Sequence, residues 1–107
     1  MKVAIHTRLK PGAERVYDEA HREVPAPLVE AMRAAGVQDW RIWRSGLDVF
    51  QVIDCPDYPA LLEALRDLPV NVAWQQRMAQ LQDVTHDYSA EGQDDGLPMV
   101  WSLKDVT

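Results

Sequence analysis

The chain has 107 residues, a formal net charge of −6 and 47% hydrophobic residues, so we expect one globular domain over residues 1–107. This acidic balance argues against a nucleic-acid backbone or an anionic membrane as the main partner. With a single cysteine, Cys55, no signal peptide and no apolar run of membrane-spanning length, the sequence predicts a soluble protein of the reducing cytoplasm.

The N-terminal third predicts one strand and one interrupted helix. Residues 3–9 (VAIHTRL) alternate apolar and polar side chains and precede a Lys-Pro-Gly turn, which is typical of a strand end. Residues 13–35 have helical spacing of apolar side chains. Pro25 and Pro27 must kink or split this helix, because proline lacks the amide donor and clashes with the preceding turn. Gly36 is a natural end to it.

The middle of the chain predicts a hairpin followed by two helices. Residues 39–44 (DWRIWR) and 49–55 (VFQVIDC) are two strands, and residues 45–48 (SGLD) form the turn between them. Residues 57–65 and 70–81 have helical patterns, with a break at the Leu-Pro pair that separates them.

The C-terminal part predicts an acidic, glycine-bearing loop over residues 89–97 and a last strand over residues 98–103 (PMVWSL). The order of strand, helix, strand, strand, helix, strand predicts an α+β, ferredoxin-like antiparallel sheet with helices on one face. Because the other face would expose apolar side chains, we expect a homodimer in which a second subunit covers it. A small-molecule site should lie between the sheet and the helix ends.

One pair of side chains stands out as a candidate for chemistry. Tyr17 and His21 are four residues apart, which places a phenol and an imidazole on one helical face. The sequence has no glycine-rich phosphate loop, no nucleophile motif and no metal-ligand spacing, so we expect no metal site and few other conventional catalytic groups. His6, in the first strand, is predicted to be hydrogen-bonded in place, and His86, beside Asp87, is predicted to lie on the surface.

Several motifs in order carry a resemblance to a known family. They are the Tyr-x-x-x-His pair at Tyr17 and His21, the run EVPAPLVEAMRAAG over residues 23–36, Trp40 and Trp43, the run WQQRM over residues 74–78, and Trp101. In this order and spacing the chain resembles the L-rhamnose mutarotase family. The resemblance implies a small homodimeric protein of the dimeric α/β-barrel type, an isomerase that interconverts the anomers of a deoxy sugar without a cofactor.

The resemblance also implies roles for particular residues. His21 would be the catalytic, proton-transferring residue, while Tyr17, Trp40, Trp74 and Gln75 would bind the sugar. The family commonly has a second tryptophan where this chain has Gln75, and often a tyrosine where it has Trp40. Both differences fall on sugar-contacting positions, so L-fucose is an alternative to L-rhamnose.

The implied reaction suits these residue types. Mutarotation opens a hemiacetal ring and closes it on the other face of the aldehyde, which requires one acid and one base near the anomeric carbon. Histidine serves in either role near neutral pH, and positioned proton transfer contributes on the order of 10² to 10⁴-fold. Tryptophan offers a flat apolar surface to the C–H faces of a sugar ring.

Other readings remain open from the sequence. Side chains alternate along a strand, so only one of Trp40 and Trp43 can face the site, and we expect the other to be packed under the helices. Trp101 is expected in the core or at the dimer interface. Dimeric ferredoxin-like domains also include cofactor-free monooxygenases and haem-handling proteins, and a non-catalytic sugar-binding module would use the same tryptophans.

Overall fold

A four-stranded antiparallel sheet forms one layer of the molecule. The structure is a computed structural model that describes residues 1–88 and 96–106. The strands pair in the order β2-β3-β1-β4. Their bounds are β1 (Lys2–Leu9), β2 (Asp39–Ser45), β3 (Asp48–Asp54) and β4 (Gln82–Val84). The expected loop falls mostly on residues 89–95, outside the described residues.

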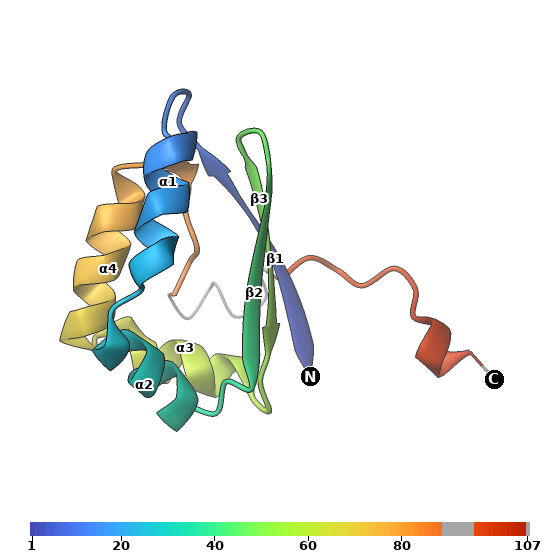
Figure 1. Cartoon of the computed structure of the whole chain (residues 1–107). Coiled ribbons are helices and arrows are strands. Elements are labelled where there is room, and N and C mark those ends of the chain that lie inside the picture. Colours follow the sequence, from blue (N-terminus) through green and yellow to red (C-terminus); the bar gives the residue numbers. More distant parts are fainter. Residues whose placement is uncertain (89–95, 107) are drawn as a thin grey trace.

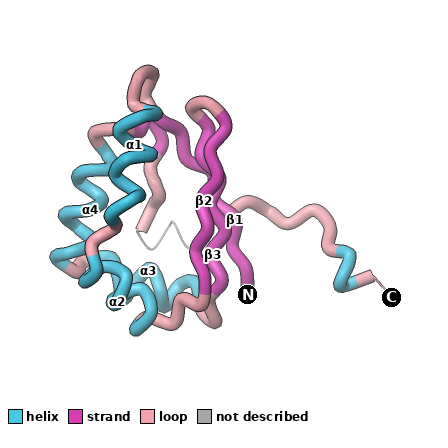
Figure 2. Tube along the Cα trace, viewed as in Figure 1, coloured by secondary structure: helices cyan, strands magenta, loops and turns pink. Residues whose placement is uncertain are grey.

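Helices cover one face of this sheet and form the second layer (Figures 1 and 2). They are α1 (Glu14–Ala20), a one-turn 3-10 helix (His21–Glu23), α2 (Ala26–Ala34), α3 (Tyr58–Arg66) and α4 (Pro69–Ala79). This arrangement confirms the predicted α+β, ferredoxin-like fold. In the part of the chain that the structure describes, no helix has the length and apolar character needed to cross a membrane.

The prolines split the first helical region as the sequence predicts. Helix α1 ends at Ala20, and Val24 has an extended backbone with φ −63° and ψ 129°. Extended geometry is favoured there because the ring of Pro25 excludes the helical conformation of the residue before it. Helix α2 then begins with Pro27 in its first turn, where a missing amide proton costs no hydrogen bond. As a result His21 lies at the end of α1 rather than in a continuous helix.

The core lies between the layers in two apolar clusters. Alternate residues of β1 and β3 face the helices, as the two-residue period of a strand requires. One cluster packs the β1 and β3 side chains against α3, and the other packs the opposite strand ends against α1, α2 and α4. Thr7 and Gln51 are buried polar residues on the same sheet face, between the two clusters. Gln51 also lines a cavity between the sheet and the helices.

The prediction of a C-terminal strand is wrong. Residues 98–102 form no strand, Leu103–Asp105 is a single 3-10 turn, and the segment runs away from the domain in Figure 1. Val100 is 96% exposed. The apolar residues there have strand-forming character, but no described strand of this chain pairs with them. The fourth strand is instead β4, which is too short and too polar to show an alternating pattern.

No helix formed by the described residues lies over the second sheet face. Trp43, Phe50 and His6 lie side by side across β2, β3 and β1 on this face, with Trp43 52% exposed and Phe50 42% exposed. The His6 ring stacks on Phe50 at 5.0 Å, and its Nε2 lies 2.9 Å from Asp48 Oδ1, which confirms the prediction for His6. Trp43 is therefore not packed under the helices, and the expectation that one tryptophan would be buried there apart from the site is wrong.

Candidate active site

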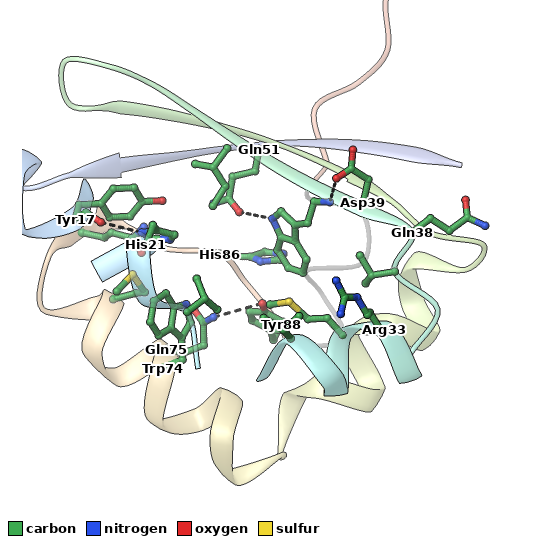
Figure 3. Close-up of a pocket in the computed structure, with 18 residues that line it drawn as sticks. Tyr17, His21, Arg33, Gln38, Asp39, Gln51, Trp74, Gln75, His86 and Tyr88 are labelled. Atoms are coloured by element: carbon green, nitrogen blue, oxygen red, sulfur yellow. Dashed lines mark hydrogen bonds between the residues drawn. The ribbon is translucent and has the colours of Figure 1, made fainter. Parts of the chain in front are cut away.

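A cavity of about 310 Å³ lies between the sheet and the helices (Figure 3). Its volume is at the lower end of the range for small-molecule sites in proteins. The structure brings all five residues predicted for the site to its walls: Tyr17, His21, Trp40, Trp74 and Gln75. Their placement agrees with the expected position between sheet and helices, while their individual roles stay predictions.

The imidazole of His21 is oriented by the main chain of its own helix. Its Nδ1 lies 2.9 Å from the carbonyl oxygen of Tyr17, one turn earlier. A carbonyl oxygen can only accept a hydrogen bond, so Nδ1 carries the proton and donates it. In the neutral ring Nε2 then has a free lone pair. His21 is thus arranged as a base with one reactive nitrogen.

A phenol lies directly beside this imidazole. The ring centroids of Tyr17 and His21 are 4.3 Å apart, and Tyr17 is only 3% exposed. Burial, followed by the negative charge of Asp18, raises the pKa of Tyr17 to about 12, so the phenol keeps its proton at neutral pH.

The Tyr17 hydroxyl is available to a ligand. It has no hydrogen-bond partner among the described residues, and no buried polar side-chain atom among them lacks one. The hydroxyl therefore reaches the cavity, and Figure 3 shows it directed toward the interior. A protonated phenol in this position can donate a hydrogen bond or a proton to a bound molecule.

The two tryptophans present aromatic surface from opposite layers. Trp74 of α4 is buried, meets His21 edge-on at 5.3 Å and has the Arg77 guanidinium 5.5 Å from its ring. Trp40 of β2 donates its indole N–H to Gln51 Oε1 at 2.9 Å. Because this donor is already used, Trp40 offers a ligand its ring rather than a hydrogen bond.

Gln75 connects α4 to the segment after β4. Its Nε2 lies 3.4 Å from both Asn71 Oδ1 and Tyr88 Oη, which are long hydrogen bonds. Its carbonyl oxygen has no partner within residues 1–88 and 96–106, and Gln75 is a lining residue of the cavity. Gln75 can therefore accept a hydrogen bond from a ligand hydroxyl.

The prediction that His86 lies on the surface is wrong. His86 is half-buried and lines the cavity, where its Nε2 is 2.8 Å from Tyr58 Oη and its ring meets Trp40 edge-on at 5.9 Å. Burial lowers the pKa of His86 to about 4, and nearby Asp87 opposes this only in part.

Sequence reasoning also missed Tyr58, Tyr88 and Gln51 as parts of this region. These residues come from three separated segments, and no local spacing links them. Among the residues that the structure describes, no three His, Cys, Asp or Glu side chains gather as a metal site would require.

Fold and cavity together define a class: a ferredoxin-like domain whose cavity is lined by aromatic rings, an imidazole and a protonated phenol. The family model for L-rhamnose mutarotase matches residues 2–103, and the chain therefore belongs to the L-rhamnose mutarotase family. The protein is accordingly a sugar mutarotase, an isomerase.

A solved structure is similar to this chain in fold. The L-rhamnose mutarotase from Formosa agariphila has a TM-score of 0.68 and 20% identity, and the match covers 83% of this chain and 86% of that one. No curated protein matches the chain by sequence.

Proposed function

We propose that the protein interconverts the α and β anomers of a 6-deoxy-L-sugar, L-rhamnose or L-fucose, with His21 as the proton-transferring residue. The observation that carries this proposal is the bond from His21 Nδ1 to the Tyr17 carbonyl, since it leaves Nε2 as an acceptor beside the cavity. The site thus combines a base, a neighbouring protonated phenol and aromatic walls in a space suited to one sugar ring.

The reaction needs two coupled proton movements. His21 Nε2 removes the proton of the anomeric hydroxyl, whose oxygen becomes the aldehyde oxygen as the bond between the anomeric carbon and the ring oxygen breaks. The ring oxygen takes a proton from the Tyr17 hydroxyl and becomes a hydroxyl. After the aldehyde rotates, reversal of these steps closes the ring on its other face and returns both protons.

Apolar and polar parts of the sugar have matching walls. Trp40 and Trp74 cover C–H faces of the ring, while Met32 and Val37 line the cavity beside α2 and offer surface for the methyl group. The Gln75 carbonyl oxygen accepts from a sugar hydroxyl. Each direct hydrogen bond of this kind is worth about 1 kcal/mol, so the orientation of the hydroxyls decides which sugar is preferred.

Anomer exchange measured by saturation-transfer NMR tests the proposal. The protein is added to equilibrated L-rhamnose and L-fucose in separate tubes, and exchange between the anomeric resonances is compared with that in buffer. We expect protein-dependent exchange in at least one tube, and the faster tube identifies the preferred sugar. Unchanged exchange in both would overturn the assignment of L-rhamnose or L-fucose as the substrate.

Two histidine variants make the test specific to the site. His21→Ala should reduce exchange by on the order of 10² to 10⁴-fold, because it removes the base. His6→Ala is the matched control, since His6 lies on the opposite sheet face and should leave the exchange rate unchanged. Full activity in His21→Ala would exclude His21 as the base.

We also propose that a second copy of the chain covers the open sheet face. Trp43 and Phe50 form an exposed aromatic pair there, and Val84 of β4 adds a further exposed apolar side chain. A patch of this kind marks an interaction surface in a protein that stays in solution. A two-fold contact would bury the same patch on both copies at once.

A further inference from the structure

We infer that His86 binds the sugar directly, offering its Nδ1 to a sugar hydroxyl from the cavity wall formed by Trp40 and Tyr88. The inference rests on the proposed function, because it names a further substrate contact in the same cavity. It assigns a role to a residue for which the sequence predicted only a surface position.

Aromatic neighbours fix the position of the His86 ring. Tyr58 lies nearly parallel to it at 6.3 Å, Tyr88 is tilted against it at 4.3 Å, and Trp40 meets it edge-on at 5.9 Å. Figure 3 shows His86 among the side chains that line the cavity. A ring held on several sides loses little further entropy when a ligand binds, which favours a specific contact.

The hydrogen bond to Tyr58 determines which atom remains for a ligand. Nε2 is engaged with Tyr58 Oη at 2.8 Å, so Nδ1 is the other polar atom of the ring. Nδ1 has no partner in the described ranges, and no buried polar side-chain atom there is unsatisfied, so Nδ1 is solvent-accessible in a residue that lines the cavity. A sugar hydroxyl both donates and accepts, and it can therefore pair with Nδ1 in either tautomer.

The wall that carries His86 is anchored to the helical layer. Arg66 of α3 donates from Nε to the Tyr88 carbonyl at 2.7 Å, and Gln75 of α4 reaches the Tyr88 hydroxyl. Tyr58 is itself the first residue of α3 and is buried. The segment after β4 is thus held at both of its cavity-facing aromatic positions, 86 and 88.

The role of His86 is binding rather than proton transfer. Because burial lowers the pKa of this imidazole to about 4, the ring is neutral at pH 6–8 and is a weak base. Loss of its hydrogen bond should therefore raise KM and leave kcat nearly unchanged. This separates His86 from His21, whose loss should lower kcat.

Two isosteric substitutions test the two ring nitrogens separately. His86→Gln places an amide near the Nε2 position and keeps a partner for Tyr58, but it removes the group at Nδ1. His86→Asn places its amide near the Nδ1 position and keeps a polar group toward the cavity. We expect His86→Gln to raise KM about three- to tenfold with kcat within about twofold, and His86→Asn to recover most of the loss.

Each result of these measurements either supports the inference or overturns it. An unchanged KM in both variants, an equal rise in both, or a fall in kcat at constant KM would overturn it. Thermal melting of each variant verifies that it is folded. If a variant does not fold, long-range ¹H–¹⁵N spectra of the wild type still decide: the His86 Nδ1 resonance should shift when L-rhamnose or L-fucose is added, and no shift at saturation overturns the contact.

The same experiment distinguishes failure of the His86 inference from failure of the proposed function. If the wild type binds a sugar but does not accelerate its anomer exchange, the proposed substrate and mechanism fail, while the dissociation constants of His86→Gln and His86→Asn still test the contact. If exchange is accelerated and the His86 Nδ1 resonance does not respond to saturating sugar, only this inference fails.

Discussion

Two histidines in one cavity differ in the group that fixes each ring. His21 donates from Nδ1 to a main-chain carbonyl, which sets its tautomer and leaves Nε2 as a base. His86 is bonded through Nε2 to a phenol and is kept neutral by burial. The same side-chain type is therefore adapted to proton transfer at one position and to hydrogen bonding at the other.

Substituting Tyr17 by phenylalanine tests the phenol alone. Tyr17→Phe keeps the ring and the carbonyl that orients His21, but removes the hydroxyl proposed as the acid. We expect kcat for anomer exchange to fall by about 10²-fold with a smaller change in KM, because proton transfer is lost and the aromatic wall remains. Kinetics at several sugar concentrations measure both constants, and a wild-type kcat would exclude Tyr17 as the acid.

The buried imidazole of His86 should make the fold sensitive to acid. Its pKa is about 4 in the folded chain and about 6.5 when unfolded, so the unfolded state takes up the proton first as pH falls. The free energy of unfolding should decrease between about pH 7 and pH 4, by up to about 3 kcal/mol from this group. Denaturant titrations of wild type and His86→Gln check this, since the variant lacks the ionisable ring; equal pH dependence would contradict the assignment.

At the scale of elements, α3 links the core to the cavity wall. Its apolar side chains fill one of the two core clusters, and its first residue, Tyr58, holds His86. The helix begins with the Asp57 carboxylate accepting from the Ala60 amide at 3.0 Å, followed by Pro59 in the first turn. This N-cap is a local feature that supports a distant contact in the cavity.

Removing the N-cap of α3 should therefore lower stability. Asp57→Ala leaves an amide of the first turn without its partner and should reduce the free energy of unfolding by about 1 kcal/mol. Asp67→Ala, at the exposed C-terminal end of the same helix, is the matched control and should have a much smaller effect. Chemical denaturation measures both, and equal losses in the two variants would show that the cap contributes nothing specific.

Local patterns predicted those elements whose signal lies within one segment. The prolines at positions 25 and 27 correctly divided the first helix, and alternation correctly predicted β1. β4 could not be predicted, because its three residues, QDV, have no strand pattern of their own and form a strand only by pairing with the end of β1. The segment 98–103 was misread for the opposite reason, since strand propensity without a partner strand forms no sheet.

The candidate site also contains residues that one segment of sequence predicts and residues that only tertiary packing brings together. Tyr17 and His21 could be found because their spacing of four is a property of one helix. Trp40, Trp74 and Gln75 came from the family resemblance, and the structure places them at the same cavity. His86 could not be found, because only tertiary packing brings the segment after β4 against Tyr58 and Trp40.

At the scale of the whole molecule, the helices of the described residues cover one sheet face and leave the other open. Trp43 and Phe50 lie opposite each other in the register of β2 and β3, so two exposed aromatic side chains are neighbours on the open face. The C-terminal segment also exposes apolar side chains, Trp101 among them, so Trp101 does not lie in the core of this chain.

A charge placed on the open face should weaken self-association. Trp43→Glu would bury a carboxylate against a second copy, so the dimer proposed here should dissociate to monomer at micromolar concentration. Val72→Glu is the matched control, because Val72 is partly exposed on α4, in the helical layer. Light scattering coupled to size-exclusion chromatography gives the mass of each; a monomeric wild type would contradict the proposal.

The carbonyl that orients His21 belongs to the main chain, and this has a consequence for how the family can diversify. Any amino acid at position 17 supplies the same oxygen, so the tautomer of His21 does not depend on which side chain stands there. The walls of the cavity can therefore change by substitution to suit a different sugar while the orientation of the base is retained. At position 17 the oxygen that orients His21 and the side chain that faces the sugar are thus separate parts of one residue.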